Sequence, residues 1–90
     1  MSIKVNIHST LAYYTNGQAV VEVDGSTVGQ CLNELVKKLP ETKKVLFDKG
    51  GGLHNYIEVY INQESAYPDE LAKPVNDGDE LDIFLILAGG

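Results

Sequence analysis

The sequence predicts an α+β domain in which one main helix packs on one face of a mixed sheet of four to five strands. Three observations predict this class. Apolar and polar residues alternate over 3–7, 19–23 and 57–61, which is typical of half-buried strands. Residues 28–39 carry the apolar stripe of an amphipathic helix. Residues 81–87 are almost continuously apolar, which indicates a central strand covered at least partly on both faces.

Length and composition limit the possible functions. The chain has 90 residues, enough for one domain with one modest core. Seven basic and thirteen acidic residues give a net charge of −6, which argues against nucleic acid as a partner and predicts a basic rim on a protein partner. No stretch approaches the roughly 18 apolar residues that span a bilayer, and the N-terminus does not resemble a signal peptide, so we expect no membrane association and a cytoplasmic location.

The N-terminal part of the chain predicts an antiparallel hairpin with a long connection. Ile3, Val5 and Ile7 alternate with polar residues, as do the apolar residues of 19–23. Between these strands, residues 11–13 favour one helical turn, and Asn16-Gly17 is a strong tight-turn signal.

The main helix is predicted to begin after Thr27, whose hydroxyl can accept the Gln30 amide while the Gln30 side chain reaches back in a capping box. Pro40 disfavours helical geometry at the residue before it and ends the helix. The apolar stripe consists of Val28, Cys31, Leu32, Leu35, Val36 and Leu39. A short second turn at 45–47 and a glycine-rich loop at 48–52 are expected to come next.

The C-terminal part predicts short elements and then the last strand. These are a strand at 57–61, a turn at 62–64, a short edge strand at 65–67, a helical turn at 69–72, a tight turn at 76–79 and the last strand at 81–87. A hairpin, a crossover helix and a last strand inserted beside the first make a β-grasp arrangement, with the first and last strands parallel at the centre of the sheet. We expect residues 1–87 to form this domain and Ala88-Gly89-Gly90 to form a flexible C-terminal tail.

The chain resembles the MoaD/ThiS family of sulfur carriers, which are relatives of ubiquitin, over its whole length. The resemblance rests on the opening strand, Thr27-Val28, the strand ending at Asn62, residues 76–81 and the Ala88-Gly89-Gly90 ending. Residues 53–62 look most like the branch that includes the cysteine-biosynthesis sulfur carrier. Two departures stand out: many members have proline where this chain has Leu85-Ile86, and often glycine where it has Gln63.

The resemblance implies a protein co-substrate rather than an enzyme, with no bound cofactor or metal. An E1-like enzyme that uses ATP and Mg would adenylate the carboxylate of Gly90, and sulfur would then displace AMP to leave a thiocarboxylate. The carrier, as the small subunit of a sulfur-transferring synthase, would deliver this sulfur in molybdopterin, cysteine, thiamine or tRNA chemistry. It is expected to be a monomer when free.

The candidate site residues are the tail and the surface at its root. Gly89 and Gly90 lack a Cβ, so with Ala88 they can thread a narrow channel; the alternative is a floppy end or a cloning scar. Leu81, Ile83 and Leu85 share the parity that faces the core. Phe84 and Ile86 therefore point to the open face of the sheet near Tyr60, as a docking patch for a partner or as ordinary apolar surface.

Other chemistry-bearing residues form no constellation in the sequence. His8 and His54 are predicted to be surface or loop histidines, and Cys31 a buried structural thiol. Gly50-Gly51-Gly52 lacks the Lys-Ser/Thr of a phosphate loop. Asp77, Asp79 and Glu80 fit turn residues and a solvated rim better than a cation site.

Two rival functions remain open from the sequence. A ubiquitin-like modifier would join the same activated Gly90 to a target lysine through an isopeptide bond. An interaction module would use the domain only to dock on a partner. The pathway that receives the sulfur, the sulfur source and the choice between carrier and modifier are not determined by the sequence.

Overall fold

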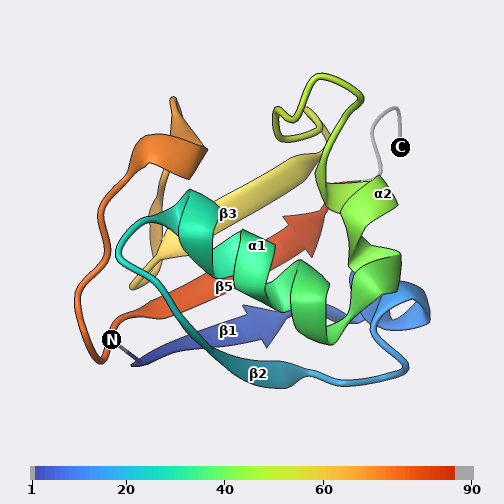
Figure 1. The fold of residues 1–90 in the computed structure, drawn as a ribbon, viewed down its shortest axis with the longest axis horizontal. Coiled ribbons are helices and arrows are strands. Elements are labelled where there is room, and N and C mark those ends of the chain that lie inside the picture. The colour runs from blue at the N-terminus through green and yellow to red at the C-terminus, as the bar shows by residue number, and fades with distance from the viewer. Residues whose placement is uncertain (1, 87–90) are drawn as a thin grey trace.

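A computed structural model describes residues 2–86 of the chain. Its centre is a five-stranded sheet in the order β2-β1-β5-β3-β4, with α1 lying across one face (Figure 1). The strands are β1 (Ser2–Ile7), β2 (Val20–Asp24), β3 (Ile57–Ile61), β4 (Glu64–Ser65) and β5 (Glu80–Leu85). β1 pairs antiparallel with β2 and parallel with β5, and β3 pairs antiparallel with β5. This is the β-grasp arrangement that the sequence predicts.

The helix α1 (Val28–Lys38) begins and ends where its sequence signals predict. The Thr27 hydroxyl accepts the Gln30 amide at 3.1 Å. The Gln30 side chain differs from the predicted capping box, because its oxygen accepts from the amide and the hydroxyl of Ser26, both at 2.8 Å, rather than from Thr27. The side chain of Gln30 therefore reaches one residue further back than in a capping box, and hydrogen bonds join the first turn of the helix to the loop before it.

Shorter helical segments join the strands. The connection after β1 forms the 3-10 helix η1 (Ser9–Tyr14), which is longer than the single predicted turn. Asn16 and Gly17 come next with positive φ, as their turn signal predicts. The remaining segments are η2 (Pro40–Thr42), α2 (Lys43–Leu46) and η3 (Glu70–Ala72).

The core lies between α1 and the sheet. The alternating residues of the central strands are fully buried, including Leu81 and Ile83 of β5. Leu32 and Leu35 of α1 are fully buried against them, and Leu85 packs only partly against this cluster. Phe84 and Asp82 have the opposite parity, so the predicted division of β5 into a core face and an open face is confirmed.

Only β3 has the predicted bounds, since β1 and β2 each differ by one residue and the larger differences lie in β4 and β5. β5 is Glu80–Leu85 rather than 81–87, and it ends opposite Ile57, the first residue of β3. On its other side β1 stops earlier, at Ile7 opposite Ile83. β4 is Glu64–Ser65 rather than 65–67. Asn62 and Gln63 both adopt positive φ, so the chain reverses in two residues and pairing resumes at once with Glu64 opposite Ile61.

Residues 2–86 contain no helix that is long and apolar enough to cross a membrane.

Candidate functional site at the end of the central strand

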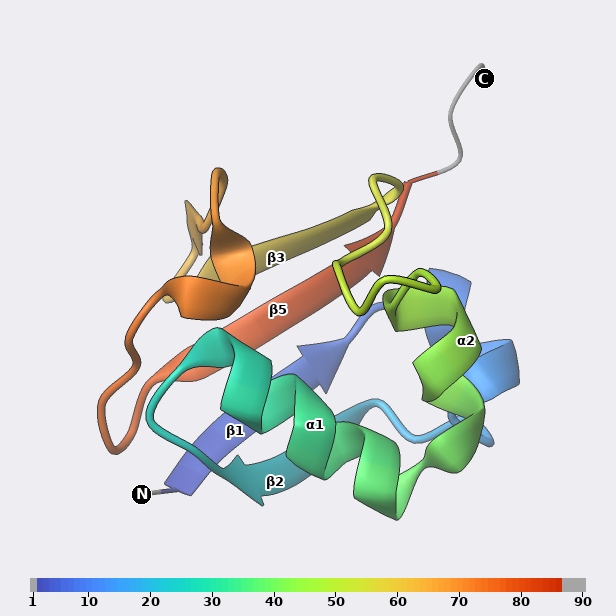
Figure 2. The same cartoon turned by 45° about the horizontal axis from the view of Figure 1, so that its top comes forward.

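The predicted tail begins three positions after the end of β5, and β5 is the most central strand of the sheet. It is bordered by β1 on one side and by β3 on the other, and it runs toward the side of the molecule that carries α2 (Figures 1 and 2). Ala88, Gly89 and Gly90, which the sequence analysis singles out, lie outside the described residues. The structure therefore defines the site up to Ile86, the last described residue.

The end of β5 is held by three backbone groups on two sides. The Ile83 carbonyl accepts the His8 amide at 3.0 Å, just past the end of β1. The Leu85 amide donates to the Thr10 hydroxyl oxygen at 3.2 Å, and the Ile86 amide donates to the Tyr56 carbonyl at 2.7 Å. The Thr10 hydroxyl and the Tyr56 carbonyl that hold Leu85 and Ile86 thus belong to no strand, and Leu85 also pairs with Ile57 of β3.

The open face of the sheet carries an aromatic cluster at this end. The ring of Phe84 lies edge-on to that of Tyr60, with centroids 5.6 Å apart, and is tilted on that of His8 at 5.2 Å. Tyr60 stands opposite Asp82 in the β3–β5 register, which confirms that it lies beside the last strand. Phe84 and Tyr60 are partly exposed, and Ile86 is 41% exposed. We call His8, Tyr60, Phe84 and Ile86 the root patch.

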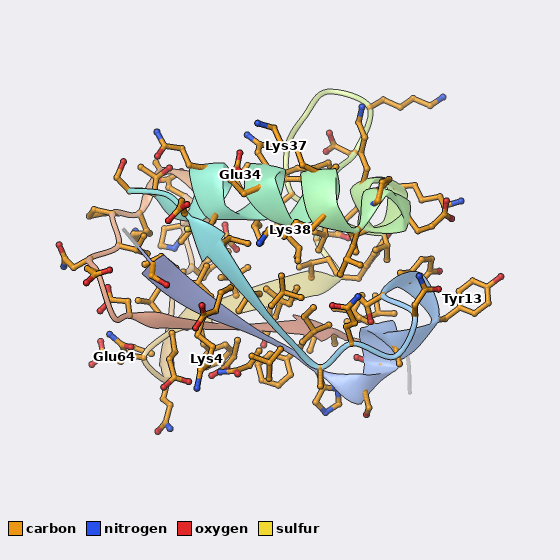
Figure 3. The ribbon with its side chains drawn as sticks, turned by 60° about the horizontal axis from the view of Figure 1, so that its bottom comes forward. Lys4, Tyr13, Glu34, Lys37, Lys38 and Glu64 are labelled. Carbon is orange, nitrogen blue, oxygen red and sulfur yellow. The ribbon has the colours of Figure 1, made fainter. Side chains whose placement is uncertain are left out.

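Acidic side chains surround the root patch. Glu58 stands opposite Phe84 in the register, and Asp82 and Glu80 precede Phe84 on the same face. The side-chain nitrogen of Asn6, Nδ2, donates to the carboxylates of Asp82 and Glu80, each at 2.9 Å, which holds the two carboxylates side by side. Lys4 lies on this same face, away from α1 (Figure 3). The surface around the patch is therefore predominantly acidic.

The two histidines have separate structural surroundings. His8 caps η1 through its Nδ1, and His54 stacks on Tyr56 with centroids 4.6 Å apart. Over the described part of the chain, no three His, Cys, Asp or Glu side chains come together in a way that could hold a metal ion.

Cys31 is fully buried in the stripe of α1, as predicted. Burial raises the pKa of its thiol, since desolvation penalises the thiolate. The buried, protonated thiol fits a packing role better than a reactive one.

Two sequence pieces that carry the family resemblance meet at the far end of the sheet. The Asn62 side chain donates to Asp79 at 3.0 Å and accepts the Glu80 amide at 3.0 Å. Asp79 also accepts the Asn76 amide at 2.8 Å, and these two bonds lower the pKa of its carboxyl. These residues join the β3 turn to the start of β5, so they serve the fold rather than a cation site.

Sequence reasoning missed Thr10, His8 and Tyr56 as parts of the site. Thr10 and His8 lie in the connection after β1, and Tyr56 lies just before β3, where no periodicity assigns them a neighbour. The one available signal was the position of His8 and Thr10 immediately after a strand that runs parallel to the last one. Parallel neighbours end at the same edge of a sheet, so the segment after the first strand lies near the end of the last strand.

Comparison with known proteins places this geometry among related chains. The model of the ThiS family matches residues 5–90. Small archaeal modifier protein 1 of Haloferax volcanii is 38% identical over 71 residues, which is 78% of each chain. The crystal structure of that protein aligns over 100% of both chains with a TM-score of 0.88 and 32% identity.

A second structural relative is found in a complex. The structure of the Amycolatopsis orientalis BexX/CysO complex contains a chain that matches with a TM-score of 0.84 and 32% identity, over 98% of this chain and 99% of that one. These likenesses confirm the predicted ubiquitin-like β-grasp fold. They also agree with the prediction of a small carrier or modifier protein that is not itself an enzyme.

Proposed function

Because this chain belongs to the ThiS family, we propose that it is a sulfur carrier whose working group is the carboxylate of Gly90. The observation that carries the proposal is the family match over residues 5–90, which extends through the Gly89-Gly90 pair. The fold supports it, because the central strand β5 leads directly to these residues. We also propose that the protein acts in the cytoplasm.

The proposed reaction has two steps, both on a partner enzyme. In the first, an E1-like enzyme uses ATP and Mg to join the Gly90 carboxylate to AMP and release pyrophosphate. A carboxylate is a poor electrophile, and the acyl-adenylate makes its carbon open to attack. In the second, a sulfide nucleophile attacks that carbon and expels AMP, which leaves a thiocarboxylate. An acceptor synthase would then hold this sulfur and its substrate at high effective concentration.

The root patch is the proposed docking surface for these partners. Its rings and Ile86 offer apolar area at the end of the described chain, and the acidic residues around it favour a partner with a basic rim. Association with another protein is documented for a relative, since CysO is found in a complex with BexX. We propose that the free chain is a monomer and that sulfur goes to molybdopterin, cysteine or thiamine synthesis.

A mass measurement tests the carrier proposal. The chain is incubated with the E1-like enzyme of its native host, MgATP and sulfide, and its intact mass is recorded. We expect the increase that corresponds to exchange of one oxygen for sulfur, confined to the C-terminal peptide. Omission of ATP is the control. If only the unmodified chain is found in the complete reaction, the carrier function is wrong.

The second candidate is a protein modifier, which the 38% identity to a small archaeal modifier protein favours. In that case the activated Gly90 would form an isopeptide bond with a lysine of a target. The last basic residue is Lys73, followed by Pro74, so trypsin would leave a long remnant on the target. An Ala88→Lys variant would leave only Gly89-Gly90, and such remnants on cellular lysines would identify the modifier.

A further inference from the structure

The end of β5 extends past the strand beside it, and a side chain takes the place of that strand. The last residue pair between β1 and β5 is Ile7 with Ile83. The next amide of β5 that points toward the β1 side is that of Leu85. If β1 continued, this amide would donate to a backbone carbonyl of β1. Instead η1 brings the Thr10 hydroxyl within 3.2 Å of it. A single hydroxyl therefore replaces one step of the hydrogen-bond ladder.

The Thr10 hydroxyl is itself oriented by His8. Nδ1 of His8 accepts the Thr10 amide at 3.3 Å and lies 3.0 Å from the Thr10 hydroxyl oxygen. In the tautomer that leaves Nδ1 unprotonated to accept this amide, the hydroxyl donates to Nδ1, and its oxygen keeps lone pairs with which to accept another bond. Leu85 supplies the donor. The bonds thus run in one direction, from the Leu85 amide to the Thr10 hydroxyl and from that hydroxyl to His8.

The opposite side of the strand is held independently. The Ile86 amide donates to the Tyr56 carbonyl at 2.7 Å, in the segment just before β3. Consecutive amides of a strand point to opposite sides, so Thr10 accepts the Leu85 amide on one side of β5 and Tyr56 accepts the Ile86 amide on the other. Figure 2 shows the loop before β3 reaching the end of β5 on the side away from β1.

These two amides occupy the positions where the resemblance leads one to expect proline. Proline fixes φ by its ring and has no N–H to donate. This chain has Leu85 and Ile86 there, and both of their N–H groups are engaged. Hydrogen bonds therefore restrict the backbone at the position where a ring would restrict it in those relatives.

We propose that Thr10 is a positioning residue for the activation of Gly90, because its hydroxyl sets the direction in which the chain leaves β5. The proposal rests on the proposed function. Five residues come after Leu85, so the carboxylate of Gly90 lies at most about 17 Å from it. At that reach, a change of direction of about 20° at Leu85 would move the carboxylate by up to about 6 Å. Displacements well below this size cost large factors in rate when two reacting groups must meet.

The test compares Thr10→Val, which removes the hydroxyl at nearly equal volume, with Thr10→Ser, which keeps it. ATP–pyrophosphate exchange by the E1-like enzyme is measured against the concentration of each carrier. We expect kcat to fall about three- to ten-fold for Thr10→Val, the range that one neutral hydrogen bond supports, with KM changed less than about two-fold. KM is preserved because the root patch is intact. Thr10→Ser should recover most of kcat, and Thr10→Ala should behave as Thr10→Val does.

Thr27→Val is the matched control. It also removes one threonine hydroxyl that accepts a backbone amide, that of Gln30, but at the opposite end of the molecule (Figure 1). It should lower the melting temperature without changing kcat or KM. Hydrogen exchange of the Leu85 amide supplies a readout that does not depend on the enzyme. It should become faster in Thr10→Val and Thr10→Ala and remain slow in Thr10→Ser and Thr27→Val.

The outcomes separate this inference from the proposed function. If the wild-type chain is not adenylated, the proposed function is wrong, and the role of Thr10 in it is wrong as well. If the wild-type chain is adenylated and Thr10→Val has an unchanged kcat, the positioning role alone is overturned. A kcat that falls equally for Thr10→Val and Thr27→Val also overturns it, since that pattern would report lost stability. Unchanged exchange at Leu85 would show that the hydroxyl does not hold the strand.

Discussion

Replacement of Phe84 by alanine separates docking from folding at the root patch. The ring lies on the face of the sheet that α1 does not cover and contacts the rings of His8 and Tyr60. Truncation of a fully buried phenylalanine costs about 3–5 kcal/mol. Phe84 is only partly buried, so we expect about 1–2 kcal/mol of lost stability. For a domain of this size that lowers the Tm by about 5–15 °C.

The effect on docking should be larger. An aromatic residue at the centre of an interface typically contributes about 2 kcal/mol or more, so we expect Phe84→Ala to weaken binding to the E1-like enzyme by about 30-fold or more. Isothermal titration without ATP measures this affinity directly, and chemical unfolding followed by circular dichroism measures the stability. Both are recorded at a temperature where each variant is fully folded.

Val20→Ala is the control, since Val20 is 52% exposed on the same face but lies on the outer strand β2, opposite Asn6. It should change stability by less than about 0.5 kcal/mol and leave the affinity unchanged. An unchanged affinity of Phe84→Ala would refute the assignment of this face. So would complete loss of the fold, because Phe84 would then be a core residue.

Three further predictions concern the tail, the thiol and the far end of the sheet. Deletion of Gly90 should abolish pyrophosphate exchange with little change in Tm in calorimetry; a fall of many degrees would contradict a tail outside the core. Burial raises the pKa of Cys31, so it should resist a thiol-specific dye at neutral pH and react once urea unfolds the chain. Rapid labelling of the native chain would show that it is accessible. Hydrogen bonds from the Asn76 amide and the Asn62 side chain lower the pKa of the Asp79 carboxyl below 3.8. The contribution of Asp79 to the stability of the fold is therefore present above that value and is lost as pH falls through the folded pKa. The stability gap between wild type and Asp79→Asn should therefore close in acid unfolding curves, and a constant gap would disprove this.

Periodicity predicted the strands, the helix and their order because burial dictates it. The alternation in β1 and the stripe of α1 each have one apolar face, and only one layered arrangement buries both. The parity of β5 likewise assigned Phe84 to the open face. The end of β5 at Leu85 could not be predicted, since that residue faces the first residue of β3, Ile57, and no feature within 81–87 records where a neighbouring strand begins.

The contacts that hold the site depend on atoms that pattern reasoning does not consider. Thr10 acts through one hydroxyl in a 3-10 helix, and Tyr56 acts through a backbone carbonyl that any residue would supply. His8 was predicted to be an ordinary loop histidine, and its contacts with Thr10 and Phe84 appear only when the connection after β1 folds over the end of β5. Such long-range polar contacts leave no period in the sequence.

The position of β5 between a parallel and an antiparallel neighbour has a mechanical consequence. A partner that pulls on the residues after Ile86 applies force along the axis of β5. The hydrogen bonds to β1 and β3 run across that axis, so they are loaded together in shear and do not open one after another. Extraction of the strand would also draw Leu81 and Ile83 out of the core in the same movement. The chain can therefore be gripped by its end and drawn into an enzyme while the domain that carries it resists unfolding.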